Sequence, residues 1–488
     1  MRRLSAWFRS HPLTAIFLVL IGVAVGTHLL ANWRAEVRWQ RYCAAARARG
    51  VKLTLAEFAP PEIPDAENFA ALPMFKAIFL PGAKDSMALP DVPGGKPGFG
   101  APQKAEHFDW QKWQTYFKAA GFIAETTDSP PRDVLRALEH YAPQLKEWSE
   151  WKNRPRCRFS LDLKAGAFMP LPHLGMFVNA AKLFSLRMRA HLALGDSSAA
   201  YGDFREGLQA YRALIEEPVL LSGLVRIAAM DTLLSAVGEG LAAHAWTEPE
   251  LKKIADDLFS IHVGDDYLRA FSSERGIGNF GDDQIVALPP WQRGQKLLAV
   301  NAGASAFGTT SHVPGWVFFV IPKRLCRDNQ LRYNQYMDEM CDRVSRDRLS
   351  FGPEVGMPTH SEELEGWDAY YFFLFSQPVP VFANVAERFV HLLTKLDQTR
   401  LAVALERCRL ARGAYPETLP ELVPDFISEV PMDVYSRQPL IYHRKEGGTF
   451  LLYGVGKNRT DDGAKINPVD GQNQQRDAIW FFAPPPSK

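Results

Sequence analysis

Hydrophobic positions near the N-terminus form one unbroken run rather than an amphipathic pattern. Leu13–Ala31 contains 19 residues without a charged side chain, close to the roughly 20 apolar residues that a helix needs to cross a bilayer. Arg2, Arg3 and Arg9 precede this run, and Trp33 follows it where an interfacial aromatic is expected. The pattern predicts a single membrane anchor within residues 1–35, with the N-terminus inside and the body outside.

A cleaved signal peptide is the alternative interpretation of the same run. Ala24-Val25-Gly26 offers the small residues of a cleavage site, but the apolar part of a signal peptide normally has only about 7–15 residues. Arg34, Arg38 and Arg41 follow the run, so the charge difference across it gives little guidance on orientation. The anchor is the preferred interpretation, and the signal peptide stays open.

The next part of the chain changes twice in character. Arg34–Arg49 is a basic stretch that we expect to continue as a helix beyond the anchor. Residues 56–105 are rich in proline and glycine, which predicts an irregular arm without long helices or strands. Residues 36–105 are therefore interpreted as a basic helix followed by an arm.

From residue 106 the hydrophobic positions follow the 3.6-residue period of amphipathic helices. Trp110, Trp113 and Phe117 fall on one helical face. Asn179–Leu214 reads as two helices joined at a glycine turn, and Thr247 begins a further helix with a capping-box pattern. The sequence predicts an irregular α-helical bundle or solenoid-like body over residues 106–385.

The period changes again in the last hundred residues. A helical run from Leu392 to Arg412 gives way to Gly413 and then to short strand-like segments, among them Leu451–Gly456 and Ala478–Phe482. We therefore expect a small α+β domain in residues 386–488, so that the fold class is mainly α.

Composition limits the function classes without selecting one. The 488 residues are 47% hydrophobic and 23% charged, which is ordinary for globular domains. The 56 Lys and Arg nearly balance the 55 Asp and Glu, so no global field favours nucleic acid. The five cysteines contain no C-x-x-C pair, which argues against a zinc site. A Cys326–Cys341 bridge is the alternative to unpaired thiols.

One stretch stands apart in charge. Residues 284–327 contain no Asp or Glu but carry several Lys and Arg together with Trp291 and Trp316. Contact with an anionic membrane surface is one interpretation. A Gly/Ala/Ser-rich loop followed by a buried apolar segment is the preferred one.

Motifs with a known chemistry do not hold up in context. Gly276–Gly281 matches G-x-G-x-x-G, but no strand precedes it and no acidic residue follows at the required spacing. We expect its glycines to form a turn. Glu274 and Arg275 are expected to form a surface ion pair. His173, His191, His244 and His262 occur singly, which indicates structural roles rather than metal binding.

An acidic loop near the C-terminus is the one candidate metal site. Asp461, Asp462, Asp470 and Asp477 lie close together in the sequence with Asn458 and Asn467. Calcium takes six to eight oxygen ligands in a flexible geometry. The alternative is that Asp, Asn and Gly are simply the residues from which turns are built.

A series of motifs in about the last 90 residues resembles the globular domain of the major pseudopilin of type II secretion systems. The series comprises Leu401–Arg407, Gly413–Leu419 with its Tyr415-Pro416 step, Leu422-Val423-Pro424, Val430–Asp433, Gln438–Tyr442, Leu452–Gly456 and Asp477-Ala478-Ile479. The resemblance implies a helix packed on a small antiparallel sheet. It also implies a calcium ion in the loop before the last strand, with Asp477 and Asp461 or Asp462 at the matching positions.

The resemblance does not extend to the pilus function. A prepilin peptidase needs a Gly, a Phe-like residue and a Glu at the start of the apolar segment, and Leu13–Ala31 has no acid. Processing and assembly into a pilus are therefore not expected. Together with the arm residues Ile63–Ala70, the whole chain resembles uncharacterised membrane-anchored proteins of planctomycetes and verrucomicrobia, for which no activity can be transferred.

These observations predict a single-pass protein of a bacterial inner membrane, with the bilayer contacted by residues 13–31 and the body in the periplasm. A scaffolding or partner-binding role is the leading hypothesis for the helical body. A membrane-tethered enzyme is the alternative. A cleft in which His and Glu side chains converge would favour the enzyme, and a wide concave apolar face would favour the binder.

Overall fold

Helices make up most of the structure, a computed structural model, and a small antiparallel sheet lies near the C-terminal end. The structure describes residues 12–89, 108–305, 321–345, 350–351, 371–372, 374, 379–445, 448–464 and 478–480. The α-helices are α2 (Pro12–Ala48), α3 (Pro73–Ile78), α4 (Trp110–Ala119), α5 (Pro130–Leu138), α6 (Ala142–Trp148), α7 (Leu174–Ala193), α8 (Ser197–Arg212), α9 (Leu220–Ala242), α10 (Glu248–Phe259), α11 (Val263–Ala287), α12 (Pro290–Ser305), α13 (Lys323–Asp342) and α16 (Val379–Arg412). The mainly helical fold class is confirmed.

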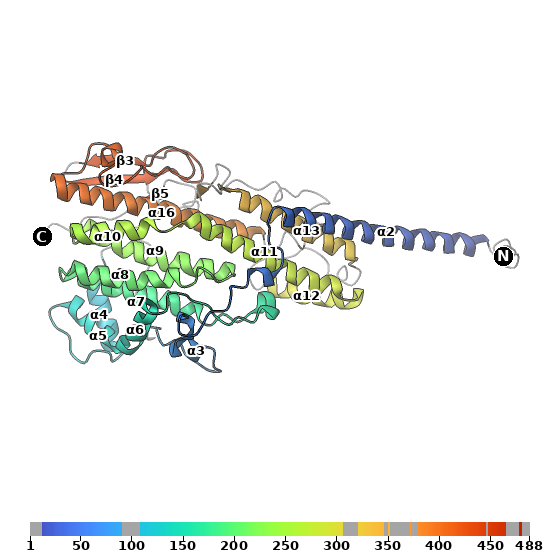
Figure 1. Cartoon of the computed structure of the whole chain (residues 1–488), viewed down its shortest axis with the longest axis horizontal. Helices are drawn as coiled ribbons and strands as arrows, with labels where there is room; N and C mark the ends of the chain where they lie inside the picture. The colour runs from blue at the N-terminus through green and yellow to red at the C-terminus, as the bar shows by residue number, and fades with distance from the viewer. Residues whose placement is uncertain are drawn as a thin grey trace.

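The helices stack in layers along an elongated body, and α2 projects from one end of it (Figure 1). Helices α3 to α6 form one side, followed by α7 and α8, then α9, and then α16 with the sheet. Helices α11, α12 and α13 form the end from which α2 emerges. This layering buries two large apolar clusters, one under α3 to α7 and one between α8, α9, α10, α11, α13, α16 and the sheet.

Two helices are long and apolar enough to cross a bilayer, and their surroundings differ. Helix α9 is a core helix, since 67% of its apolar window is buried between neighbouring helices. The apolar window of α2 is 0% buried. Large side chains such as Phe17, Leu20 and Val23 are 58–61% exposed, so the N-terminal part of α2 carries an apolar surface that the body leaves uncovered.

The helical hairpin predicted around Gly195 is present as α7 and α8. Gly195 has φ of 78°, a left-handed conformation that glycine adopts without strain. The side chain of Asp196 then accepts a hydrogen bond from the backbone N–H of Ala199 and caps α8. A turn residue and a capping residue in sequence thus fix where one helix ends and the next begins.

Helix α10 begins where the sequence predicts, but its cap differs from the expected one. Thr247 precedes Glu248 as the N-cap residue, and its side chain makes no capping bond to the backbone. Its hydroxyl donates instead to the carboxylate of Glu250. The reciprocal capping box is therefore absent, although the helix start is as predicted.

The described part of the proline-rich arm packs into the body. It contains the short 3₁₀ helices η1 (Leu55–Phe58) and η2 (Phe69–Ala71) and helix α3. The rings of Phe69 and Phe75 are fully buried and lie 5.0 Å apart, against Trp148 and Phe177. Residues 90–105 of the predicted arm lie outside the described residues.

The prediction that Gly276–Gly281 forms a turn is wrong. All three glycines of this motif lie inside α11, and none has a positive φ. The small size of Gly276 and Gly278 allows close packing: a Cβ on Gly276 would lie 3.1 Å from the Leu55 backbone, and one on Gly278 would lie 2.5 Å from the Tyr333 ring. The motif therefore lets α11 pack closely against Leu55 and Tyr333, and the spacing of its glycines does not indicate this role.

Near the C-terminus, a three-stranded antiparallel sheet follows α16, so the expected small sheet is present. The strands are β3 (Ile441–Lys445), β4 (Thr449–Gly454) and β5 (Ala478–Ile479), in the order β3-β4-β5, with a separate pair β1 (Val344–Ser345) and β2 (Ser350–Phe351). Tyr442 pairs with Leu452, and Tyr453 pairs with Ile479. Leu452 is fully buried beside residues of α16.

The alternative of a Cys326–Cys341 bridge is excluded. Both residues lie on α13, and 15 helical residues separate them by about 22 Å along the axis. A disulfide requires Cα atoms within about 7 Å. All five cysteines are buried and unpaired.

A glycine pair on α11 tests the packing role of the motif. Gly278→Ala should lower the free energy of unfolding by about 1–3 kcal/mol, because its Cβ would overlap the buried Tyr333 ring. Gly281→Ala, with nothing within 4 Å of its added Cβ, should leave stability unchanged or raise it by up to about 1 kcal/mol. Urea unfolding of the two variants gives both values, and equal effects would contradict the packing role.

Candidate functional site

The most elaborate polar structure in the described chain is the junction where the C-terminal half of α2 meets α11 and α13. Along α2 the pattern changes from uniformly apolar to amphipathic: Ala35, Trp39, Cys43 and Ala46 are buried at helical spacing, on one face. This face packs on α13, which runs in the same direction. The predicted basic helix after the apolar segment is thus an unbroken continuation of it.

The first polar cluster of the junction centres on Glu36. Its carboxylate lies 3.0 Å from Nζ of Lys323 and accepts a hydrogen bond of 3.1 Å from Nε of Arg327. Burial raises the pKa of Glu36, but hydrogen bonds from Gln40, Lys323 and Arg327 outweigh it and lower the pKa to about 2. Arg327 also donates to Asp283 on α11 at 2.5 Å, so one guanidinium links three helices.

The second polar cluster centres on Asp338 of α13. One carboxylate oxygen accepts from the Tyr42 hydroxyl at 3.0 Å and from Arg49 at 2.8 Å, and the other accepts from Arg275 at 2.6 Å. The Arg275 side chain is only 3% exposed. Burial raises the pKa of Asp338, while Arg275, Arg49 and Tyr42 lower it more, so the group is charged at neutral pH.

The predicted surface ion pair between Glu274 and Arg275 is wrong. Neighbouring residues of a helix point in different directions, and Arg275 points into the junction toward Asp338 and Tyr42. Burial raises the pKa of Glu274 to about 7, and a backbone hydrogen bond at Leu220 lowers it only in part. Glu274 and Arg275 do not pair because the carboxylate that contacts Arg275, that of Asp338, lies on another helix.

Three buried amides complete the junction. Asn279 donates to the backbone oxygen of Leu53 at 2.9 Å, and Asn334 donates to Asn279 at 2.7 Å. Gln330 donates to Asn279 at 3.3 Å. These bonds connect α11, α13 and the segment after α2, so each buried amide has a partner.

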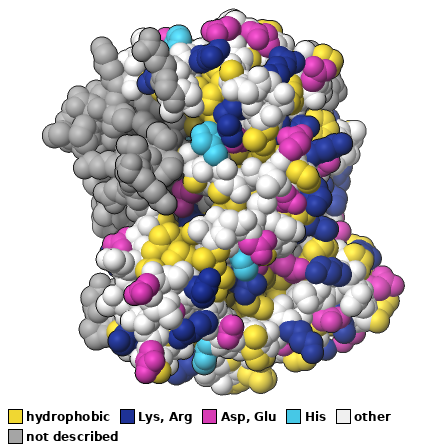
Figure 2. Space-filling view, turned by 90° about the vertical axis from the view of Figure 1, so that its left-hand side faces the viewer, with side chains coloured by type: hydrophobic (Ala, Val, Ile, Leu, Met, Phe, Trp, Pro, Cys, Tyr) yellow, Lys and Arg dark blue, Asp and Glu magenta, His cyan; other side chains and the backbone are white. Residues whose placement is uncertain are grey.

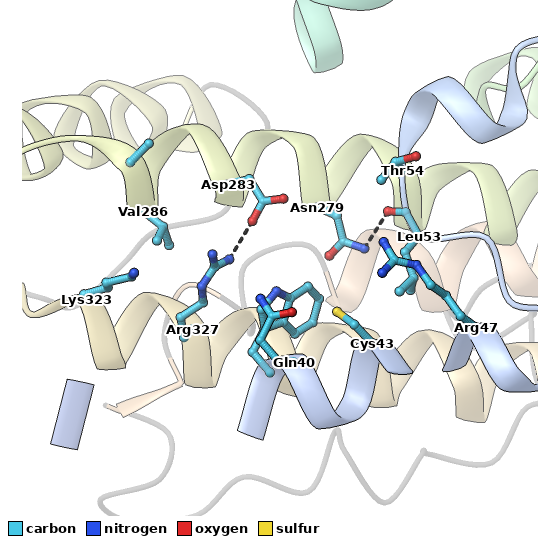
Figure 3. A pocket seen from close by; sticks show the side chains of 12 residues that line it. Gln40, Cys43, Arg47, Leu53, Thr54, Asn279, Asp283, Val286, Lys323 and Arg327 are labelled. Atoms are coloured by element: carbon cyan, nitrogen blue, oxygen red, sulfur yellow. Dashed lines mark hydrogen bonds and ion pairs between the residues drawn. The ribbon is translucent and has the colours of Figure 1, made fainter. Parts of the chain in front are cut away.

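Beside the first of these clusters lies a cavity of about 400 Å³, lined in part by Lys323, Arg327 and Asp283 (Figure 3). Figure 3 shows Lys323 and Arg327 at one end and Arg47 at the other. Its lining comes from α2, α11, α13 and the segment after α2: Trp39, Gln40, Cys43, Arg47, Leu53, Thr54, Asn279, Asp283, Val286, Ala287, Lys323 and Arg327. The lining is both apolar and polar, with three cationic side chains against one carboxylate.

The cavity offers recognition rather than covalent chemistry. Among the residues that line the cavity, Cys43 carries the one thiol group. Burial raises the pKa of this thiol, and the charges of Arg47 and Arg327 counter the effect only in part. A thiol is a poor nucleophile because the thiolate is the reactive form. The arrangement can therefore hold an anion beside an apolar surface.

Two other clusters have the residue types of nucleophilic catalysis but not its geometry. Lys395 Nζ lies 2.9 Å from Ser235 Oγ, yet it also donates to Asp231 at 2.5 Å, so its nitrogen is held in an ion pair and is not directed at the serine alone. In the other cluster, Glu217 lies between Ser222 and His173. A serine hydrolase needs the histidine in that middle position to take the serine proton.

Paired carboxyl groups with raised pKa values are a further mark of catalytic sites. Burial and the neighbouring Asp283 raise the pKa of Asp282 to about 7, with Arg327 acting in the opposite direction. Glu274 has a similar pKa. The two lie eight residues apart on one helix, about 12 Å along its axis, so they do not act on one substrate atom.

The single histidines lie in separate places. His173 is fully buried, 2.9 Å from Glu217, with its ring stacked on Phe159. His244 contacts Glu406 at 3.0 Å, and His191 lies 3.5 Å from Asp203. Within the described residues, no group of three or more His, Cys, Asp or Glu is placed to hold a metal ion.

The acidic loop predicted to bind calcium is described only in part. Asp461 accepts hydrogen bonds from the Tyr453 hydroxyl at 3.1 Å and from the Gly463 backbone at 2.8 Å. Asp462 accepts from Asn458 at 2.9 Å. Asp470 and Asp477 lie outside the described residues. The described carboxylates thus support a turn, and the calcium site stays a prediction.

Comparisons of the chain with known protein families, with curated proteins and with solved structures found no match. The function is therefore argued from the geometry of this chain alone.

The junction was not foreseen from the sequence. The local pattern of buried positions in residues 35–46 indicates that α2 packs on something, but it does not indicate on what. The partners Asp328 and Asp338 lie 289 to 296 residues away along the chain. A single sequence contains no signal that pairs such distant charges.

The Glu36 cluster predicts a pH dependence of stability. The carboxylate has a folded-state pKa near 2, below its ordinary value of 4.5. Its contribution is therefore complete above the ordinary value and is lost as the pH falls toward 2. Glu36→Gln should cost about 1–2 kcal/mol at neutral pH, and its difference from the wild type should shrink as the medium is acidified.

Urea unfolding of the full chain in neutral detergent, followed by tryptophan fluorescence, measures this difference. Glu429→Gln is the control, because Glu429 is exposed. A wild-type to Glu36→Gln difference that does not change with pH would contradict the role of the carboxylate.

The calcium prediction has its own test. If the acidic loop binds the ion, the full chain should melt at a higher temperature with calcium than with chelator, since a ligand of the folded state stabilises it. Asp461→Ala and Asp477→Ala should abolish the shift, while Glu429→Ala should retain it. The same shift in all three variants would place the ion elsewhere, and no shift in the wild type would remove the site.

Proposed function

We propose that the protein is a single-pass, membrane-anchored envelope protein whose helical body binds protein partners or acts as a scaffold. The observation that carries the proposal is the continuity of α2. The apolar window of its first half is 0% buried, and one face of its second half packs on the body, with no break in the helix between them. The proposed topology places the N-terminus in the cytoplasm and the body in the periplasm.

The exposed apolar half of α2 matches the needs of a bilayer. Its backbone hydrogen bonds are satisfied within the helix, as a membrane requires. Trp33 is 63% exposed directly after the apolar segment, where aromatic side chains gather at a membrane surface. In water these exposed Leu, Ile, Val and Phe side chains would form a large apolar patch of the kind that marks a membrane or protein contact.

The continuity of α2 from its apolar half into its packed half supports an anchor over a removable signal. Ala35, Trp39 and Ala46 are no more than 5% exposed within the junction, and Glu36 contributes to a charged cluster. The alternative cleavage site at Ala24-Val25-Gly26 precedes these residues, so cleavage would leave the junction intact. The proposal favours retention because the apolar helix and the packed helix are one element.

The partner-binding part of the proposal concerns the end of the body opposite α2. Figure 2 shows this face, where hydrophobic side chains gather at a waist between two broader parts. Lys and Arg are interspersed with Asp and Glu around them. Protein interfaces have this mixed composition, with apolar contacts inside a polar rim. The proposed pseudopilin-like domain, α16 with β3 to β5, borders this end (Figure 1).

A membrane-tethered enzyme is the second candidate function. The specific observation in its favour is the 400 Å³ cavity at the junction, which is large enough for a small molecule. Its lining residues, however, include no histidine, and the one carboxylate among them, Asp283, already accepts a hydrogen bond from Arg327. Binding is the better supported role for this cavity.

Anchoring is tested by charge insertion into α2. The full chain should stay with membranes through a carbonate wash. The double variant Leu20→Lys/Val23→Lys should appear in the supernatant, because each lysine near the centre of a span costs about 2.5–3.5 kcal/mol.

Phe259→Lys adds the same charge at a side chain that is 68% exposed on the body, and it should stay with the membrane. Release of the wild-type chain would overturn the anchor. Cross-linking in the native envelope followed by capture of the chain tests partner binding, and a chain recovered without any cross-linked protein would argue against a scaffold.

A further inference from the structure

We propose that the cavity at the α2–α11–α13 junction binds the phosphate group of an anionic ligand, and that the ligand is a membrane lipid headgroup. The part that concerns lipid rests on the proposed membrane anchoring. The part that concerns phosphate rests on the cavity alone. Three observations support the proposal: the position of the cavity along α2, the charged groups that line it, and the hydrogen-bond donors of those groups that have no protein acceptor.

The cavity begins beyond the end of the apolar segment: Trp39, the first residue of α2 that lines it, is eight residues after Ala31 and therefore about 12 Å farther along the helix. Asn32 directly follows that segment, and its side chain accepts a hydrogen bond of 2.8 Å from the backbone N–H of Arg324. Lys323, which directly precedes Arg324, lines the cavity. Arg327 contacts Glu36, five residues beyond Ala31 and therefore about 8 Å farther along the helix. The headgroup layer of a bilayer has a similar depth, roughly 5–8 Å.

The cationic donors of the cavity suit an anion. Lys323 and Arg327 stand together at one end (Figure 3), where Glu36 contacts both of them and Asp283 contacts Arg327. With Arg47 at the other end, the cavity and its edge hold three cations against two carboxylates. Arginine binds phosphate through its planar set of N–H donors, and lysine binds it as a point charge. Basic pockets beside membrane helices bind anionic headgroups in this way.

Arg327 retains donors for a ligand. Its Nε donates to Glu36, and its Nη1 donates to Asp283 and Gln330. Among the residues that the structure describes, none accepts a hydrogen bond from its Nη2. The residue as a whole is only 9% exposed, so its position is fixed before any ligand arrives. A preorganised donor loses little entropy on binding.

The rest of the lining suits the uncharged part of a headgroup. Trp39 and Val286 supply apolar surface, and Gln40 and Thr54 supply polar groups. A cavity of about 400 Å³ is within the usual range for small-molecule sites. At the far end, Arg47 adds a third cation. The site thus fits a small polar group that carries a phosphate at the Lys323 end.

Binding can be measured by calorimetric titration of the full chain in a neutral detergent. The probes are short-chain phosphatidylglycerol, short-chain phosphatidylcholine and glycerol phosphate. We expect saturable binding of phosphatidylglycerol and weaker binding of phosphatidylcholine, which has no net charge. Lys323→Gln should weaken the binding of phosphatidylglycerol about fivefold, the usual contribution of one cation near an anionic lipid.

Arg324→Gln is the matched control. Arg324 is the neighbour of Lys323, is exposed, and does not line the cavity, so its loss changes the surface charge at the same level without changing the cavity. Its affinity should equal that of the wild type. Ala287→Phe, at an exposed position of the lining, should block the cavity and abolish binding without removing a charge.

The outcomes separate the sources of the phosphate. Saturable binding of the lipid alone supports a headgroup, and equal binding of glycerol phosphate supports the phosphate site with a soluble ligand. Equal losses in Lys323→Gln and Arg324→Gln, or no saturable binding, would overturn the site. Membrane retention is measured independently by the carbonate wash, so a failed anchor and a failed cavity are distinguished.

Discussion

A buried guanidinium has to meet a carboxylate, because an unpaired charge away from water costs several kcal/mol. Arg275 is such a group, and Asp338 neutralises it from the neighbouring helix. The same carboxylate accepts hydrogen bonds from Tyr42, within the last two turns of α2, and from Arg49, just beyond its end. Charge compensation inside the body and attachment of α2 are therefore one interaction. Loss of Asp338 would disturb both at once.

The consequence is a stiff connection between an apolar helix and a folded body. Between Ala31 and Trp39 the helix continues, and packing on α13 begins within a turn of the end of the apolar segment. A flexible linker would allow the body to tumble over a membrane, whereas a continuous helix gives it a set orientation. The cavity with Lys323 and Arg327 is thereby held at a constant height beside the end of the apolar segment, and the far face in Figure 2 is held away from it.

Local signals in the sequence predicted local structure well. Gly195 and Asp196 marked the hairpin between α7 and α8, and the helix with following short strands was expected in residues 386–488. These features depend on conformational preferences of a few adjacent residues. The same kind of argument failed for Gly276–Gly281, which was expected to turn and is helical. Glycine permits a turn, but it also permits close packing in a helix, and the neighbours decide between the two.

The candidate site was beyond the reach of the sequence for the same reason. The buried face of α2 follows helical spacing and can be recognised in the sequence of residues 35–46. The pairing of Glu36 with Arg327, in contrast, joins residues 291 positions apart. The acidic loop shows the opposite case, in which a suggestive composition is partly accounted for by turn hydrogen bonds at Asp461 and Asp462.

By itself, the sequence determined that this chain is mainly helical, that it has a long apolar helix near its N-terminus and that short strands follow a helix near its C-terminus. Those properties follow from hydrophobic period, turn residues and segment length, which act over a few residues. Only the tertiary structure decided that the apolar helix runs unbroken into the body, that Arg275 faces Asp338 rather than Glu274, and that cations gather around a cavity beside it. Long-range packing and the need to pair buried charges fix these features, and both depend on contacts between segments far apart in the chain.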